Sequence, residues 1–253
     1  MKLPKEIDSS HLIETIVEIR IETTHDIPQA LWAGQMSSAL RETGFVYLEM
    51  PEINIVSESD TTAKIRIDRP IPDTSILLFA NQEKSLRFVL AKNAISFNCV
   101  AGKYIGWLEY KAAIHQVLKI LEEVRIIIGY DRTMIRYISE YIDTNILDQL
   151  IVDISVNSAC SETMPLSTQE IQFTSTDKNT SVFVAVSGIK KRALIIGETK
   201  NSSLFDVTVY EPLDSEASIN EVLASLDAIH LIQKESFFGL LKDDFIKTLS
   251  PIY

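Results

Sequence analysis

The chain has 253 residues, of which 46% are hydrophobic and 23% are charged, which is the composition of an ordinary globular protein. The formal net charge of −11 disfavours nucleic-acid binding, because that binding needs lysine and arginine in numbers. No apolar run is long enough to cross a bilayer, and residues 1–11 lack a signal-peptide pattern. We therefore expect a cytoplasmic protein with no membrane contact.

The first predicted element is a strand at residues 12–22, LIETIVEIRIE, in which apolar and charged residues alternate. A period of two predicts one buried face and one solvated face. A helix is expected next, because Asp26 can act as its N-cap and Pro28 can occupy its first turn.

The middle of the chain predicts several short strands and then the clearest helix. The helix is expected at residues 107–124, where apolar residues recur at spacings of three and four. The strands are expected around residues 45–56, 63–68, 75–80, 85–91 and 94–100.

The remainder of the chain repeats this order of elements. A strand at 132–141 and a short helix at about 143–150 precede further strands, and helices at 216–231 and about 235–249 end the chain. The segment SGIKK, together with Arg192, is expected to form a solvated hairpin turn. The further strands are expected near residues 151–156, 169–176, 181–187, 192–198 and 204–210.

This order predicts an α+β fold of two similar halves, each a mainly antiparallel sheet packed by helices. Each half reads strand, helix, strands, helix, and the halves are expected to be residues 1–125 and 126–253, closely packed together. The order resembles the tandem halves of TATA-binding-protein-like folds, a resemblance that carries no function.

The common catalytic signatures are absent from the sequence. There is no G-x-S-x-G elbow and no glycine cluster of the kind that cradles phosphate, and the four histidines show no metal-ligand spacing. The two cysteines, Cys99 and Cys160, stand far apart, which argues against a thiolate zinc site. We therefore expect no catalytic residue, no metal and no cofactor.

Two motifs resemble those of a sporadically distributed bacterial family of uncharacterised proteins of about this length. The family begins with a signature close to P-L-x-E-A-V-x-E-I-R-F, and His11 and Ile21 replace its proline and phenylalanine here. The residues that match this signature are Leu12, Glu14, Val17 with its neighbour Ile16, Glu18, Ile19 and Arg20.

A second motif, RTMIRYIS, is similar to the family's central R-x-G-L-R-Y-I-N. Met134 replaces its glycine and Ser139 its asparagine, so any role of those two positions is in doubt. The matching residues are Arg132, Arg136, Tyr137 and Ile138, and further family-like features are Tyr104, Trp107, Asp227, His230 and Phe237.

Both motifs begin a predicted half, and their polar residues form the candidate binding set. One interpretation is simple cross-strand ion pairing, and the other is a binding surface that spans the two halves. The candidate residues are Glu14, Glu18, Arg20, Arg132, Arg136 and Tyr137.

Three functions remain open at this stage. The first is a non-catalytic interaction protein, regulatory, antitoxin-like or defence-associated, which holds a basic protein partner through an acidic or mixed-charge surface. Residues 201–253 contain nine acidic and three basic residues, which favours such a partner, and a homodimer is also open. The second is an enzyme or small-ligand receptor with a pocket between the halves. The third, nucleic-acid binding through the sheet, is disfavoured by the net charge.

Overall fold

The computed structural model covers most of the two predicted halves. It describes residues 3, 4, 7, 11–23, 29–48, 77–83, 85–91, 93–100, 103–152, 170–177, 179–193 and 199–253.

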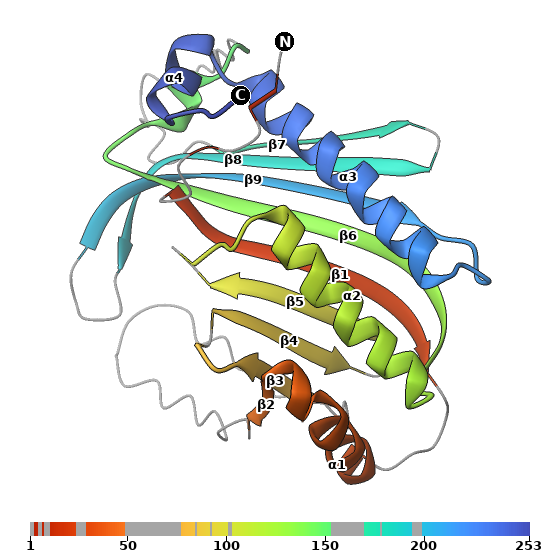
Figure 1. The fold of residues 1–253 in the computed structure, drawn as a ribbon. Helices are drawn as coiled ribbons and strands as arrows, with labels where there is room; N and C mark the ends of the chain where they lie inside the picture. The colour runs from red at the N-terminus through yellow and green to blue at the C-terminus, as the bar shows by residue number, and fades with distance from the viewer. Residues whose placement is uncertain are drawn as a thin grey trace, which may run out of the picture.

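The described part of the chain forms one nine-stranded sheet, in which neighbouring strands are all antiparallel (Figure 1). The strand order across the sheet is β2-β3-β4-β5-β1-β6-β9-β8-β7. The strands are β1 (Leu12–Thr23), β2 (Phe45–Leu48), β3 (Leu77–Asn81), β4 (Leu86–Ala91), β5 (Ala94–Val100), β6 (Ile127–Ile142), β7 (Glu170–Asp177), β8 (Thr180–Ala193) and β9 (Thr199–Pro212).

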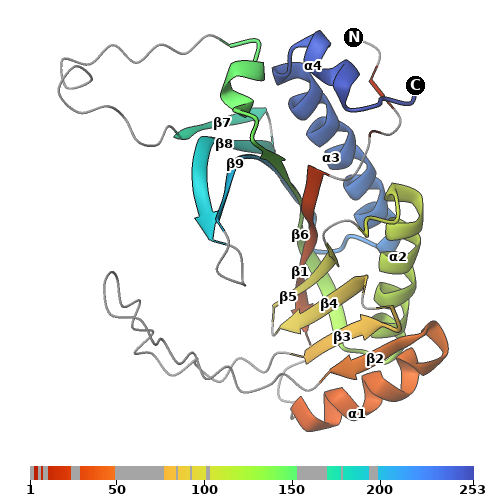
Figure 2. The ribbon, with the colours of Figure 1, turned by 90° about the vertical axis from the view of Figure 1, so that its left-hand side faces the viewer.

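The long helices lie together on one face of this sheet, and the opposite face carries no described helix (Figures 1 and 2). We call the uncovered side the helix-free face. The helices are α1 (Gln29–Leu40), α2 (Trp107–Glu123), α3 (Ile219–Leu240) and the short α4 (Asp243–Thr248), with 3₁₀ turns η2 (Arg41–Thr43) and η3 (Ile146–Gln149).

The predicted opening strand is confirmed, and it lies at the centre of the sheet between β5 and β6. Thr15, Val17, Ile19 and Ile21 are buried towards the helices, as the period of two requires. The intervening residues lie on the helix-free face, so the sequence pattern of β1 sets both sides of the molecule.

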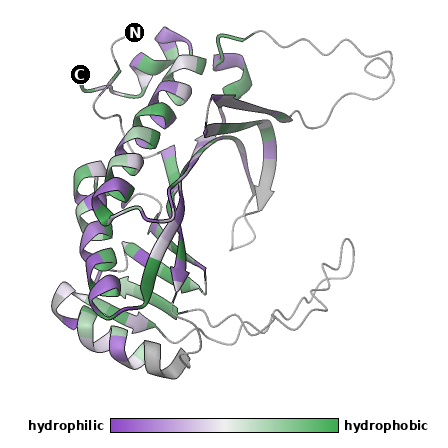
Figure 3. Cartoon of the chain, turned by 90° about the vertical axis from the view of Figure 1, so that its right-hand side faces the viewer, coloured by the Kyte–Doolittle hydropathy of each residue, from purple (hydrophilic) through white to green (hydrophobic). Residues whose placement is uncertain are grey.

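The core lies between the helices and the sheet. The stripe predicted on α2 is buried there, and Ile114, Val117 and Leu121 are fully inaccessible to solvent. Hydrophobic and hydrophilic residues interchange along the helices (Figure 3), as packing through one side requires. The prediction of an α+β fold with a mainly antiparallel sheet is therefore confirmed.

The end of the chain differs from the prediction. A single helix, α3, runs to Leu240, and the expected helix at 235–249 is instead the end of α3 followed by α4. The break falls at Leu241, which is extended and bridges to Leu150, while Lys242 N donates to Gln149 O at 2.8 Å. These contacts to a distant segment end the helix at a point where the apolar spacing of the sequence would allow it to continue.

The predicted hairpin turn at SGIKK is also wrong. This segment and Arg192 lie within β8, which pairs with β9 on both sides of an irregularity between Ser187 and Lys190. A β-bulge places an extra residue in a strand, and Gly188 is well suited to it.

The short helix expected at 143–150 is the 3₁₀ turn η3. The expected strand at 63–68 and most of the one at 151–156 lie outside the described residues, as does Asp26.

Candidate functional site

The predicted charged residues of the two motifs lie on the helix-free face. The β1–β6 register sets Arg20 against Arg132 and Ile16 against Arg136, so the charged side chains of both strands share one side. We call Glu14, Glu18, Arg20, Arg132 and Arg136 the ionic strip.

Glu18 holds two arginines of the ionic strip. Its Oε1 atom accepts a hydrogen bond from Arg20 Nε at 3.2 Å and another from Arg132 Nη2 at 3.2 Å. The second bond crosses from β1 to β6, so it joins the two predicted halves.

Arg136 is paired outside the strip, with Asp206 on β9. Its Nη2 donates to Asp206 Oδ2 at 2.6 Å, and its Nε lies 3.0 and 3.1 Å from the two carboxylate oxygens. The Asp206 carboxylate, which is 8% exposed as a residue, raises the pKa of Arg136 chiefly through these hydrogen bonds. The carboxylates thus pair with these three arginines within the sheet, although the buried Nε of Arg132 has no hydrogen-bond partner in the described part of the chain.

These ion pairs favour the structural interpretation for Glu18, Arg20, Arg132 and Arg136. Exposed ion pairs contribute about 0.2–1 kcal/mol each. The Arg136–Asp206 pair has the stronger geometry, because two guanidinium nitrogens donate to one carboxylate in charge-assisted hydrogen bonds. The alternative interpretation, a binding role for Glu14, Glu18, Arg20, Arg132 and Arg136, stays a prediction.

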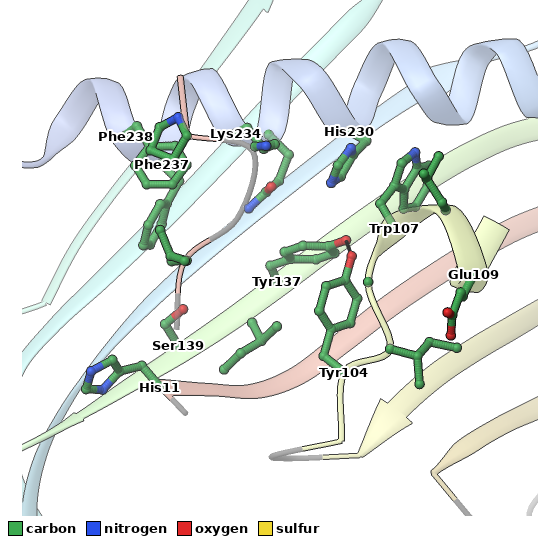
Figure 4. Close-up of a pocket in the computed structure, with 17 residues that line it drawn as sticks. His11, Tyr104, Trp107, Glu109, Tyr137, Ser139, His230, Lys234, Phe237 and Phe238 are labelled. Carbon is green, nitrogen blue, oxygen red and sulfur yellow. Dashed lines mark hydrogen bonds between the residues drawn. The ribbon is translucent and has the colours of Figure 1, made fainter. Parts of the chain in front are cut away.

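Tyr137 is separated from the other candidates by the sheet itself. It follows Arg136 in β6 and therefore points to the opposite face, towards the helices. There it lines a cavity of about 530 Å³, which lies between α2 and α3 over the start of β1 and the middle of β6 (Figure 4). This volume is within the range of small-molecule sites, roughly 300–1,000 Å³. We call it the interhelical cavity.

A glycine at the start of α2 sets one wall of the interhelical cavity. Gly106 has φ +84° and ψ 154°, a conformation that is strained for any residue with a Cβ atom. The turn it makes brings Tyr104, before it, and Trp107, after it, to the same cavity.

Tyr104 and Tyr137 connect the segment before α2 to β6 at the sheet side of the cavity. The hydroxyl groups of Tyr104 and Tyr137 lie 2.8 Å apart in a hydrogen bond, and their rings meet edge to face. Burial raises the pKa of Tyr137 well above its ordinary value. The Tyr137 hydroxyl is therefore uncharged at neutral pH.

His230 of α3 and Trp107 of α2 close the cavity where the helices meet. Their rings stack with centroids 4.2 Å apart. Asp227 fixes this contact, since it accepts hydrogen bonds from Trp107 Nε1 at 2.8 Å and from Lys111 Nζ at 2.6 Å. Burial, and secondarily the charge of Lys234, lowers the pKa of His230 to about 4, so the imidazole is neutral at pH 7.

Gln233 and Lys234 follow His230 along α3 and line the same cavity. Gln233 is only 3% exposed, and its side chain makes no hydrogen bond with the part of the chain that the structure describes. Burial lowers the pKa of Lys234. Phe237 and Phe238 form the far wall (Figure 4).

Some positions of the two motifs and of the further family-like features line this cavity although they are far apart in sequence. They are Leu12, Tyr104, Trp107, Tyr137, His230 and Phe237, together with His11 and Ser139, which stand where the motifs have other residues, and Asp227 holds Trp107 beside the cavity. The sequence motifs name these positions one by one, but no pattern in the sequence indicates that they converge. Gln233 belongs to no motif, and its only signal is that it is a polar residue on the apolar stripe of a helix.

A comparison of the chain with protein-family models finds no match, and a comparison with curated proteins finds none either. Within the described ranges, histidine, cysteine, aspartate and glutamate side chains do not gather in threes that could hold a metal ion. Among the described helices, none has the length and apolar character needed to cross a membrane.

Proposed function

We propose that this chain is a binding protein for a small molecule held in the interhelical cavity. The observation that carries the proposal is a cavity of about 530 Å³ whose lining combines aromatic walls with a few buried polar groups. A large apolar pocket with convergent polar groups is the usual form of a ligand site.

The protonation states of the lining favour binding over catalysis. A general acid or base works best with a pKa near the operating pH. The pKa of His230 is about 4, and burial raises that of Tyr137 well above its ordinary value, so neither group exchanges protons readily at pH 7.

The two predicted halves meet at the cavity, and we propose that they are structural repeats. The mirrored strand order supports this, since β5-β4-β3 and β9-β8-β7 extend outwards on opposite sides of β1 and β6. The cavity would then lie between the corresponding closing helices, α2 and α3.

A protein partner stays a second candidate, and the helix-free face is the surface that favours it. No described helix covers this face, and the sheet curves around it (Figure 2). A partner that binds this face would have to replace existing ion pairs, such as that of Arg136 with Asp206, by ion pairs with its own charged residues. Co-purification from cell extract at low salt that retrieves no protein would count against this candidate.

Binding in the cavity is testable with Nile red, an uncharged dye whose emission rises in apolar sites. Ser139 is 8% exposed and lines the cavity, so Ser139→Phe should fill it and weaken dye binding at least about tenfold. Ile138→Phe is the matched control, because the neighbouring side chain points to the helix-free face. Equal dye binding by wild type and folded Ser139→Phe would contradict the proposal.

A further inference from the structure

Gln233 is the most informative group in the interhelical cavity. A primary amide carries donors and an acceptor, so a ligand edge that offers both can form two directional hydrogen bonds with it. Gln233 is 3% exposed on a wall of the cavity, and no described residue satisfies its side chain. A molecule that offers both a donor and an acceptor on one edge would satisfy it.

The charges of the lining favour an uncharged ligand. The Glu109 carboxylate and the Lys234 ammonium both line the cavity and have opposite signs, so the walls select neither an anion nor a cation. His230 is neutral at pH 7 because its pKa is about 4. An ionised ligand would lose its hydration without gaining an unopposed counter-charge.

The shape of the lining favours a flat molecule. Aromatic side chains come from both helices and from β6, and aromatic rings prefer offset-stacked or edge-to-face contacts with other rings. The benzene and indole rings that line the cavity are those of Tyr104, Trp107, Tyr137, Phe237 and Phe238, and the imidazoles of His11 and His230 line it too.

We infer that the interhelical cavity takes an uncharged, planar aromatic molecule whose edge presents a hydrogen-bond donor beside an acceptor, as in an aromatic amide or lactam, and that Gln233 pairs with that edge. This inference rests on the proposed ligand-binding function and names the chemical class of the ligand. Gln233 is then the residue that determines specificity, and the aromatic walls supply most of the contact area.

Three probes of nearly the same size separate the effects of a hydrogen-bond donor, a hydrogen-bond acceptor and a negative charge on binding. Benzamide has a donor and an acceptor, acetophenone has only the acceptor, and benzoate is an anion. We expect isothermal titration calorimetry to find benzamide bound at least about fivefold more tightly than either of the others. Gln233→Leu should remove this preference, because benzamide loses two hydrogen bonds in the variant and acetophenone loses only one.

Gln116→Leu is the matched control, because Gln116 is exposed on α2 away from the cavity lining. If Gln233→Leu does not fold, Gln233→Met serves the same purpose. Tightest binding of benzoate, equal binding of acetophenone and benzamide, or an unchanged order in the folded Gln233 variant would overturn the inference. Nile red binding without a preference for benzamide would defeat only the ligand class, whereas loss of the dye response would defeat the cavity proposal itself.

Discussion

At the scale of a single residue, His230 connects the two helices that border the interhelical cavity. Its ring stacks on Trp107 of α2, and the charged groups around it come from both helices, with Lys111 on α2 and Asp227 and Lys234 on α3. Burial and the two lysines disfavour the imidazolium form, and Asp227 only partly opposes them. The folded protein therefore keeps this histidine neutral.

The neutral state of His230 predicts a specific loss of stability in acid. The unfolded chain binds a proton at this residue near pH 6.5, whereas the folded chain does so only near pH 4, so acid favours unfolding between these values. Stability is complete above pH 6.5 and should fall by up to about 3 kcal/mol as the pH drops to 4. Urea denaturation at pH 7 and pH 4.5 should show a larger loss for wild type than for His230→Gln. Equal losses for the two proteins would contradict the assignment.

The single residues of the two motifs could be predicted only in part. The alternation of β1 correctly separates Val17 and Ile19, which face the helices, from Glu18 and Arg20, which do not. The grouping of Tyr137 with the arginines ignored the same alternation in β6, where adjacent residues face opposite sides. Convergence in the cavity could not be predicted, because it depends on how α2 and α3 pack.

At the scale of elements, α3 is the helix that organises the site. It contributes His230 and Gln233 to the cavity lining and Asp227 to the contact with Trp107. Its N-terminus carries a capping box, in which Ser218 Oγ accepts from Glu221 N at 3.4 Å and the Glu221 carboxylate accepts from Ser218 N at 2.7 Å. Hydrogen bonds donated to the Glu221 carboxylate by the backbone N–H and the hydroxyl of Ser218 lower the pKa of Glu221.

Removal of this cap should destabilise the whole protein slightly. Ser218→Ala deletes the side-chain acceptor and should reduce the free energy of unfolding by about 1 kcal/mol. The control is Ser215→Ala, an exposed loop position, where a change within about 0.5 kcal/mol is expected. Urea denaturation of both variants measures the difference, and equal midpoints would show that the capping box does not stabilise α3.

Elements with a strong period were predictable, and those decided by distant contacts were not. The stripe of α2 predicts its extent to within one residue. The boundary between α3 and α4 depends on the contact of Leu241 with Leu150, which no local pattern indicates. The continuation of β8 through Gly188 depends likewise on β9, which pairs with both sides of the bulge.

At the scale of the molecule, contacts at the centre of the sheet and between the helices hold the two predicted halves, residues 1–125 and 126–253, together. β1 pairs with β6 along most of its length, and Asp227 links to Trp107 and Lys111 on the other side of the join. Both the backbone seam and the helix layer above it therefore combine residues from 1–125 and 126–253.

These contacts predict that the chain unfolds in one cooperative transition. The chain has two tryptophans, so Trp32→Phe leaves Trp107 as the only one, placed at the contact between α2 and α3. In this variant, Trp107 fluorescence and far-UV circular dichroism should give the same urea midpoint. Two separate midpoints would show that the segments are independent folding units.

The central position of β1 has a consequence for synthesis on the ribosome. The nascent chain can pair β1 with β5 once residue 100 has emerged, but the other edge of β1 lacks its partner until residue 142 has followed. At ordinary elongation rates this interval lasts roughly 2 to 8 seconds, during which an apolar edge with unpaired backbone groups is open to wrong partners. The glutamates and the arginine of β1 lie beside that open edge throughout the interval, so they also act as gatekeepers against aggregation of the unfinished protein.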